Sequence, residues 1–334
     1  MIVARPCQTA IPIQERSQIG EARRTAARVC AQAGLGEGDA GRVAILTTEL
    51  ATNVLIHGGG GTILVQSLGD QGSRVIEVLA VDSGPGMRDL DRCMADGFST
   101  GGTQGTGLGA TRRQADFFDA WSHPGAGTVI VARVGNGGYL DHFGAVCLPY
   151  PGEQVCGDGW LARASGDAFI VMVVDGLGHG PLAATASDTA LEAFEEVHAH
   201  SPSAILTLAH ARMAATRGGA VAVAACDLAA GTLRYAAVGN ISGALVHEGS
   251  SRGLVTQNGT VGAQIRVLRE LEYPCPQEAL LILHSDGVAT RWKLNDYPAL
   301  SSRHPALIAA VLHRDFCRGR DDATVVVARV KEPR

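Results

Sequence analysis

One short stretch, Val171 to Gly180, constrains the fold more than any other part of this chain. It reads VMVVDGLGHG, so four apolar residues run into Asp175 and glycines then alternate with larger residues. This pattern predicts a buried strand that ends at a carboxylate, followed by a tight turn in which backbone groups approach closely. Such a strand end suits Mg²⁺ and Mn²⁺, which prefer oxygen ligands. Taken alone, the pattern also fits an ordinary Asp-Gly turn.

Length and composition narrow the class of protein. A chain of 334 residues predicts about two domains, and the 46% hydrophobic and 18% charged fractions are typical of a globular protein. The net charge of -5 argues against nucleic acid as a partner. No apolar run approaches the ~20 residues that cross a bilayer, and the N-terminus lacks a signal-peptide core. The eight cysteines form no C-x-x-C pair, so we expect a cytoplasmic protein with reduced thiols.

Three patterns follow one another in the first part of the chain. The segment 39–57 has apolar residues at helical spacing, and Glu49 and Asn53 share one face of the predicted helix. A predicted strand over 74–81 ends at Asp82, which opens the sequence DSGPGM. The glycine-rich stretch 99–110, STGGTQGTGLGA, then leads into a second predicted helix. A glycine loop before a helix N-terminus suits phosphate binding, although by itself it also fits a flexible surface loop.

In this order, the three patterns resemble the N, G1 and G2 boxes of the GHKL ATPase superfamily. More narrowly they resemble the RsbT group of anti-sigma-factor serine/threonine kinases, over roughly residues 10–133. The resemblance implies a domain that binds ATP with Mg²⁺. Asn53 would ligate the Mg²⁺, Asp82 would accept a hydrogen bond from the adenine amino group, and Glu49 would act as general base. The box glycines would pack against the base (Gly84 and Gly86) and form the lid over the triphosphate (Gly105, Gly107 and Gly109).

Two alternatives for this first domain stay open from the residues alone. The domain would be a non-catalytic ATP sensor or partner-docking module, or it would capture a sigma factor directly. Kinases of the resembled type often dimerise, so a homodimer is also considered. His57 follows the Asn helix and matches no role, so it is interpreted as structural.

The second part of the chain places four aspartates where a predicted strand starts or stops beside a tight turn. They are Asp158, Asp175, Asp286 and Asp321. Four carboxylates that converge without counter-ions repel one another, so a site of this kind implies bound cations. The alternative is four unrelated turn aspartates.

The successive signatures GD, DGLGHG, SDG and DDATVVV resemble the metal-dependent PPM protein phosphatases, in the compact SpoIIE-like and RsbX-like branch, over residues 143–330. The resemblance implies two Mn²⁺ or Mg²⁺ ions bridged by Asp175, with the Gly176 carbonyl on one of them. Asp286 and Asp321 would hold the second ion, and Asp158 would support the first. A water between the ions would attack phosphorus directly. Lesser candidates are Asp322, His179 as an acid, and Arg163 as a phosphate clamp.

The sequence therefore predicts an α+β protein with two domains. A GHKL (Bergerat) α/β sandwich covers residues 1–134, a linker covers 135–141, and a PPM-type α-β-β-α sandwich covers 142–334. The families resembled act on STAS-domain proteins of the anti-anti-sigma or stressosome type. A fusion of the two would set the phosphorylation of such a partner in sigma-factor and stress signalling.

Overall fold

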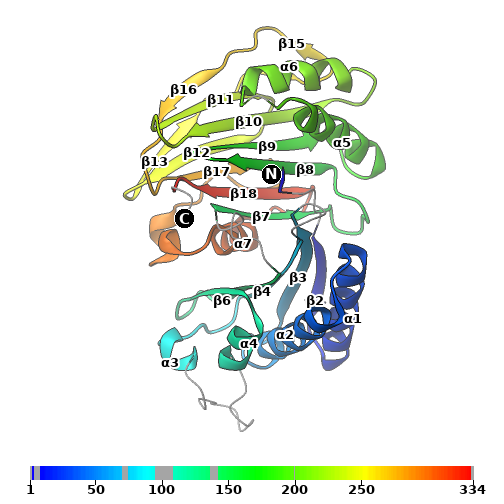
Figure 1. Ribbon diagram of the computed structural model, residues 1–334, viewed down its shortest axis with the longest axis vertical. Helices are drawn as coiled ribbons and strands as arrows, with labels where there is room; N and C mark the ends of the chain where they lie inside the picture. The colour runs from blue at the N-terminus through cyan, green and yellow to red at the C-terminus, as the bar shows by residue number, and fades with distance from the viewer. Residues whose placement is uncertain are drawn as a thin grey trace. The chain divides into compact units, whose positions relative to one another are not determined.

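The computed structural model describes residues 2–3, 8–69, 74–94, 108–135, 142–198 and 200–331 (Figure 1). Its contacts divide the chain into two compact units. The N-terminal unit comprises Gln8–Gly138 together with Asp296–Val311. The C-terminal unit comprises Met1–Cys7, Tyr139–Asn295 and Leu312–Arg334. None of the helices in these described ranges is long and apolar enough to cross a membrane.

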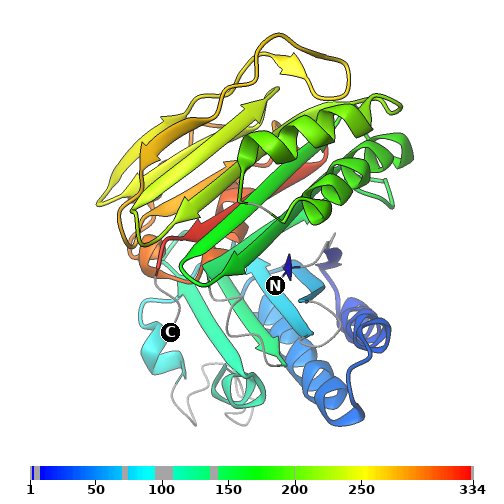
Figure 2. The same cartoon turned by 45° about the horizontal axis from the view of Figure 1, so that its top comes forward.

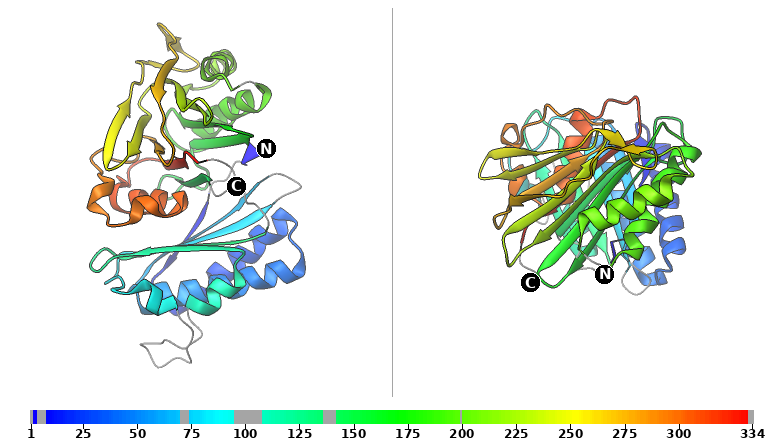
Figure 3. Two further views of the ribbon diagram at one scale, coloured as in Figure 1. Left: turned by 60° about the vertical axis from the view of Figure 1, so that its left-hand side comes forward. Right: turned by 90° about the horizontal axis from the view of Figure 1, so that it is seen from above.

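The N-terminal unit is an antiparallel five-stranded sheet with helices on one face (Figure 3). The strands in spatial order are β2 (Thr9–Ile13), β3 (Gly61–Leu68), β4 (Val75–Asp82), β6 (Thr128–Val134) and β5 (Phe117–Ser122). The helices are α1 (Arg16–Ala33), α2 (Glu37–Ile56), α3 (Leu90–Met94) and α4 (Leu108–Gln114). The apolar stripe of α2 that the sequence predicts, from Val43 to Val54, is buried in the core that α1 and α2 form with the sheet.

The C-terminal unit contains two larger sheets (Figure 2). The first has the order β1 (Ile2–Val3), β8 (Asp158–Ser165), β9 (Ala168–Gly176), β10 (Gly219–Asp227), β11 (Thr232–Val238), β16 (Leu271–Pro274). The second has the order β13 (Ser250–Leu254), β12 (Ser242–His247), β17 (Leu280–His284), β18 (Ala323–Arg329), β7 (Phe143–Leu148). A short pair, β14 (Gly259–Thr260) and β15 (Gln264–Ile265), completes the strands named in the described residues.

Helices α5 (Pro181–Glu196) and α6 (Pro202–Met213) pack on the first of these sheets and share a buried aliphatic core with it. Both begin with a proline in the first turn, where the missing N–H costs nothing. The predicted α+β class agrees with this architecture: helices pack on an antiparallel sheet in the N-terminal unit, and two larger sheets with helices form the C-terminal unit.

A segment distant in sequence covers the outer strand β5 of the N-terminal unit. Arg303 Nη1 donates to Asp119 Oδ1 at 3.2 Å, and the backbone N–H of His304 donates to Asp119 Oδ2 at 2.8 Å. Trp121 Nε1 donates to the carbonyl of Pro298 at 2.9 Å. Residues 296–311 thus follow the SDG signature along the chain but pack in the N-terminal unit. The domain boundaries at 134 and 142 stay predictions.

Candidate functional site

Two of the four strand-end aspartates face each other across one strand pair. Strands β8 and β9 are antiparallel, and their register places Asp158 directly opposite Asp175. Directly opposed residues of an antiparallel pair point to the same face of the sheet. Asp158 is only 3% exposed, and its Oδ2 accepts a hydrogen bond from Ser285 Oγ at 2.6 Å. The C-terminal end of β17 therefore reaches the start of β8.

The second sheet brings the other aspartates to the same place. Asp286 follows β17, and its backbone N–H donates to the Asp175 carboxylate. Asp321 and Asp322 precede β18, which pairs with β17. The hydroxyl of Ser285 accepts from the Thr324 backbone N–H at 3.0 Å and fixes the two strand ends together. Residues that are far apart in the sequence are thus assembled at one edge by the pairing of strands from both sheets.

The glycines of the Asp-Gly pairs allow this close assembly. A Cβ atom on Gly287 would lie 1.9 Å from the carbonyl oxygen of Asp322. A Cβ atom on Gly176 would lie 2.2 Å from the carbonyl oxygen of Ala183. Any side chain at either position would force the backbone apart, so the SDG and DGLGHG signatures reflect packing as well as turn formation.

Electrostatics shows that the carboxylates share one environment. Burial and the charge of Asp175 raise the pKa of Asp158 well above its ordinary value. Burial and the charges of Asp286, Asp321 and Asp322 raise the pKa of Asp175 to about 7. Burial and the charge of Asp321 also raise the pKa of Asp286, whereas Arg318 and a hydrogen bond from Asn240 oppose that rise. The carboxylates therefore lie within electrostatic reach of one another and repel.

The donor set fits hard divalent cations, because it consists of carboxylate oxygens. In the described part of the chain, no group of three or more His, Cys, Asp or Glu side chains is close enough to hold a metal ion. The repulsion that raises the pKa of Asp175 is the interaction that a bound cation would convert into attraction. The residues present thus fit the cations that the PPM resemblance implies.

We expect chelator-treated protein to lose stability as the pH rises from 5 to 7. Native Asp175 keeps its proton up to about pH 7, whereas the unfolded carboxyl releases it near its ordinary value of 3.8. The contribution of protonated Asp175 to the free energy of unfolding is fully present below the pKa of the unfolded carboxyl. This contribution is lost as the pH rises through the pKa of Asp175 in the folded protein. Within this window the free energy of unfolding falls by up to about 1.4 kcal/mol per pH unit. Urea titrations at pH 5, 6 and 7 measure it. An equally steep profile in Asp175→Asn would contradict the assignment.

Two lesser candidates take up structural contacts. His179 Nδ1 lies 2.9 Å from Glu153 Oε1, and its ring stacks on Tyr150 at 4.6 Å. Tyr150 in turn donates its backbone N–H to Asp322 Oδ1 at 2.8 Å, so His179 braces the loop that holds Asp322. Arg163 lies in the middle of β8, donates to the carbonyl of Val197 at 2.7 Å and stacks over Phe194. Arg163 therefore makes its contacts away from the strand-end carboxylates.

Several residues that the GHKL resemblance assigns to ATP binding lie where α2 ends beside β4. Asp82 ends β4, is 8% exposed, and accepts hydrogen bonds on Oδ1 from the backbone N–H groups of Gly84 and Thr128. A Cβ atom on Gly58, just after α2, would lie 2.7 Å from the Asp82 side chain. A Cβ atom on Gly84 would lie 2.7 Å from the Gly58 carbonyl oxygen. Contact between glycines thus brings the end of α2 against the DSGPG turn.

Asn53 and Glu49 lie one turn apart near that end of α2, as the sequence predicts. The side-chain Nδ2 of Asn53 is buried and has no hydrogen-bond partner among the described residues. An unpaired buried amide is uncommon and suits a polar ligand. Gly86 adopts a positive φ of 67°, and a Cβ atom there would lie 2.1 Å from the carbonyl oxygen of His123. Gly109 lies in α4, whereas Gly105 and Gly107 fall outside the described residues.

Comparison with known proteins agrees with this division of the chain. The family model described as Stage II sporulation protein E (SpoIIE) matches residues 165–331, which is half of the chain. The chain belongs to the SpoIIE family. A model described as histidine kinase-like ATPase domain matches residues 12–134 of this SpoIIE-family protein. Serine/threonine-protein kinase RsbT from Bacillus subtilis (strain 168) is 35% identical over 125 residues, which is 37% of this chain and 94% of that protein.

Solved structures are similar to somewhat more than half of the SpoIIE-family chain. One, from work described as "The bacterial stressosome: a modular system that has been adapted to control secondary messenger signaling", has 26% sequence identity and a TM-score of 0.53. The match covers 56% of this chain and 98% of that chain. RsbX in complex with magnesium has 21% identity and a TM-score of 0.49, over 57% of this chain and 96% of RsbX.

The SpoIIE-family chain thus joins an RsbT-like serine/threonine kinase domain to a PPM-type protein phosphatase domain, and it is an enzyme. The match over nearly the whole length of a kinase does not favour the interpretation of the first domain as a sensor alone. Families of these two kinds use divalent metals and ATP.

Sequence reasoning missed one residue that positions the carboxylates. Asn240 Nδ2 donates to Asp286 Oδ2 at 2.6 Å from the turn between β11 and β12. In the sequence this residue is part of a Gly-Asn turn, and turn formation explains an asparagine there completely. Only the pairing of β12 with β17 places the turn beside Asp286.

Proposed function

We propose that this chain sets the phosphorylation state of one STAS-domain regulator from both directions. Its kinase domain would phosphorylate a serine or threonine of the regulator, and its phosphatase domain would remove that phosphate. The observation that carries the proposal is the gathering of Asp158, Asp175 and Asp286 at one edge, in a chain whose other half matches RsbT. Similarity to a structure from a study of the stressosome supports a partner of the STAS type.

In the phosphatase domain, Asp175 would be the ligand shared by two Mn²⁺ or Mg²⁺ ions. The Gly176 carbonyl, Asp286 and Asp321 would be further ligands, and Asp158 would support the site. When bound, the ions supply a water of lowered pKa and polarise the phosphoryl oxygens. The chain's own residues supply the geometry. Ser285 orients Asp158, and Asn240 orients Asp286, so neither carboxylate turns freely. Outer contacts of this kind matter to metal affinity nearly as much as the ligands themselves.

In the kinase domain, Asn53 would hold the Mg²⁺ of ATP and Asp82 would bind the adenine amino group. Asp82 is prepared for this role because two backbone N–H groups orient its carboxylate. Gly84 and Gly86 would leave room for the base, and Gly105, Gly107 and Gly109 would close over the triphosphate. Glu49, one turn before Asn53, would accept the proton of the attacking hydroxyl.

Two single variants separate the two activities. The Asp175→Ala chain, incubated with γ-labelled ATP, Mg²⁺ and a STAS-domain protein from the same organism, is expected to label the STAS protein. The repurified labelled protein is then incubated with Mn²⁺ and the Asn53→Ala chain, which is expected to release the label as inorganic phosphate. Label transfer by Asn53→Ala at the wild-type rate would contradict the kinase assignment. Failure of the wild-type chain to release label in Mn²⁺ would contradict the phosphatase assignment.

A further inference from the structure

A pocket of about 460 Å³ opens beside two of the strand-end carboxylates in the C-terminal unit. Asp286 and Asp321 line it together with three arginines, Arg291, Arg318 and Arg320. We call this hollow the arginine pocket. The sequence offered only Arg163 as a lesser phosphate-clamp candidate, because these three arginines lie in loops with no regular pattern. Arg320 directly precedes Asp321, and the bridge between Val288 and Cys317 brings the segment of Arg318 beside that of Asp286.

The backbone of Arg318 is held firmly against the SDG turn. Its N–H donates to the carbonyl of Gly287 at 2.8 Å. One residue earlier, Cys317 forms a bridge with Val288, and the N–H of Ala289 donates to the carbonyl of Phe316 at 2.9 Å. The chain after α7 (Pro305–Phe316) therefore runs as a short antiparallel pair with residues 287–289. This arrangement fixes the starting point of the Arg318 side chain next to Asp286.

The guanidinium group of Arg318 is available to a ligand. Arg318 lines the same pocket as Asp286 and Asp321. Within the described residues, however, no hydrogen bond or ion pair engages it. Arg314, one turn earlier in α7, differs in this respect, because its guanidinium binds both oxygens of Asp315 at 2.7 and 3.0 Å. The N–H groups of the Arg318 guanidinium are thus available to donate two parallel hydrogen bonds to an oxyanion.

The charge of the arginine pocket favours an anion once cations are bound. Its three arginines balance its three aspartates, Asp286, Asp315 and Asp321. Divalent cations on the strand-end aspartates would make the net charge of the pocket strongly positive. A phosphomonoester carries close to two negative charges at pH 7, so it would be attracted there. Two residues that would hold the ions, Asp286 and Asp321, and the arginines that would hold the phosphate therefore line one pocket.

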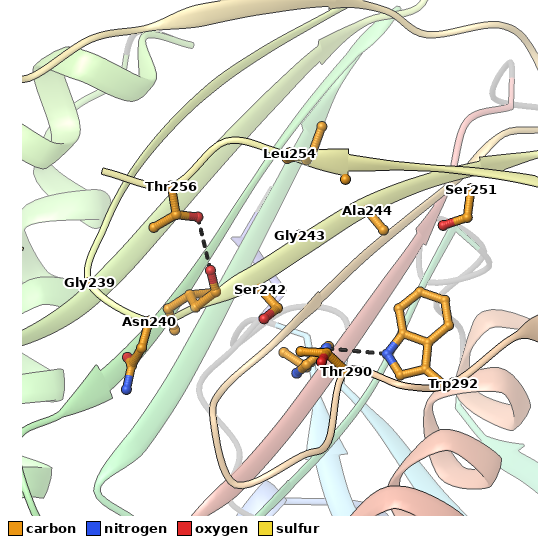
Figure 4. Close-up of a pocket in the computed structure, with 13 residues that line it drawn as sticks. Gly239, Asn240, Ser242, Gly243, Ala244, Ser251, Leu254, Thr256, Thr290 and Trp292 are labelled. Carbon is orange, nitrogen blue, oxygen red and sulfur yellow. Dashed lines mark hydrogen bonds between the residues drawn. The ribbon is translucent and has the colours of Figure 1, made fainter. Parts of the chain in front are cut away.

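A neighbouring pocket of about 430 Å³ is the contrasting case (Figure 4). It lies over β12 and β13, and none of its lining residues is Asp, Glu, Lys or Arg. Trp292 Nε1 donates to His284 Nε2, and Thr256 Oγ1 donates to the carbonyl of Ile241. Burial lowers the pKa of His284. An anionic group has no charged partner there.

We propose that Arg318 binds the phosphoryl group of a phosphoserine or phosphothreonine side chain in the arginine pocket, with Arg291 and Arg320 beside it. Arg318 thereby positions the phosphorus atom next to Asp286 and Asp321. This inference rests on the proposed phosphatase function and adds the residue that recognises its substrate. Because the guanidinium binds through two N–H groups, lysine is expected to replace it only in part.

The test compares Arg318→Ala and Arg318→Lys with Arg266→Ala, a control at an exposed arginine after β15. Calorimetry measures Mn²⁺ binding first and then inorganic phosphate binding to the Mn²⁺-loaded protein. Arg318→Ala is expected to weaken phosphate binding and to raise KM for a phosphopeptide, each on the order of 10- to 100-fold. Mn²⁺ affinity and thermal unfolding should stay at wild-type values. The phosphate affinity and KM of Arg318→Lys should fall between those of wild type and Arg318→Ala. Those of Arg266→Ala should equal the wild-type values.

The outcomes separate this inference from the proposed function. Phosphate affinity and KM of Arg318→Ala within twofold of wild type, with Mn²⁺ still bound, would overturn the inference and leave the phosphatase assignment standing. Equal effects in Arg318→Ala and Arg266→Ala would overturn it also, because a general loss of positive charge would then explain them. A wild-type chain that neither binds Mn²⁺ nor hydrolyses the phosphopeptide would overturn the proposed phosphatase and this inference together.

Discussion

Asp175→Ala is expected to reduce Mn²⁺-dependent phosphatase turnover by about 10³-fold or more. Asp175 faces Asp158 across the β8–β9 pair and accepts the backbone N–H of Asp286, so it lies between the two halves of the carboxylate cluster. Its removal would leave both proposed ions without their shared ligand. A metal contribution of several kcal/mol corresponds to a factor of this size, since each 1.36 kcal/mol is tenfold in rate. Phosphate release from a phosphorylated STAS protein measures it.

The stability of the same variant shows whether the loss is chemical. Asp175 is repelled by its neighbours in the absence of cations, so its removal relieves repulsion. Chelator-treated Asp175→Ala should therefore unfold at a temperature equal to or above that of wild type at pH 8. Asp167→Asn is the matched control, because Asp167 is exposed at the opposite end of the β8–β9 hairpin. Wild-type turnover in Asp175→Ala, or a similar loss in Asp167→Asn, would contradict the assignment.

The carboxylates could be predicted from the sequence because each is specified locally. An apolar run followed by Asp-Gly both ends a strand and places a carboxylate at its end, as at Asp175 and Asp286. The carboxylates' supporting contacts could not be predicted, because they depend on which strands pair. Asn240 reaches Asp286 only through the β12–β17 register, and Arg318 lies beside Gly287 only because the chain after α7 returns to the SDG turn.

The same limit applies to the N-terminal unit. The helical period of α2 could be predicted from the sequence, and it places Glu49 and Asn53 on the same face of the helix. No local pattern shows that residues 296–311 pack against β5, because that contact depends on two hydrogen bonds to Asp119 from a segment far along the chain. Nor does the sequence show that three polar residues of separate strands form one row. Gln66 faces Glu77 across β3 and β4, and Glu77 faces Arg133 across β4 and β6.

Breaking this row is expected to cause the largest loss of stability in the N-terminal unit. Arg133 Nη2 lies 2.7 Å from Glu77 Oε2, and Gln66 Nε2 donates to Glu77 Oε1 at 2.5 Å. Glu77 and Arg133 are only 1% and 2% exposed, so neither charge reaches water. Glu77→Ala would leave a buried guanidinium without its carboxylate, which costs about 3–5 kcal/mol. Hydrogen exchange of the β4 and β6 amides measures the change.

A triple variant separates the cost of an unpaired buried charge from the contribution of the Glu77–Arg133 ion pair to the free energy of unfolding. When both partners of a buried ion pair give way to apolar residues of similar volume, the desolvation of the charges is no longer required and the change is often neutral or stabilising. Replacing Gln66 by Leu together with Glu77 and Arg133 by Met should therefore restore most of the protection lost in Glu77→Ala. If the triple variant exchanges as fast as the single one, the row itself holds the sheet together, and the explanation by an orphaned charge is wrong. If it recovers, the packing around Phe117, over which Arg133 lies at 5.4 Å, tolerates an apolar side chain in place of the guanidinium.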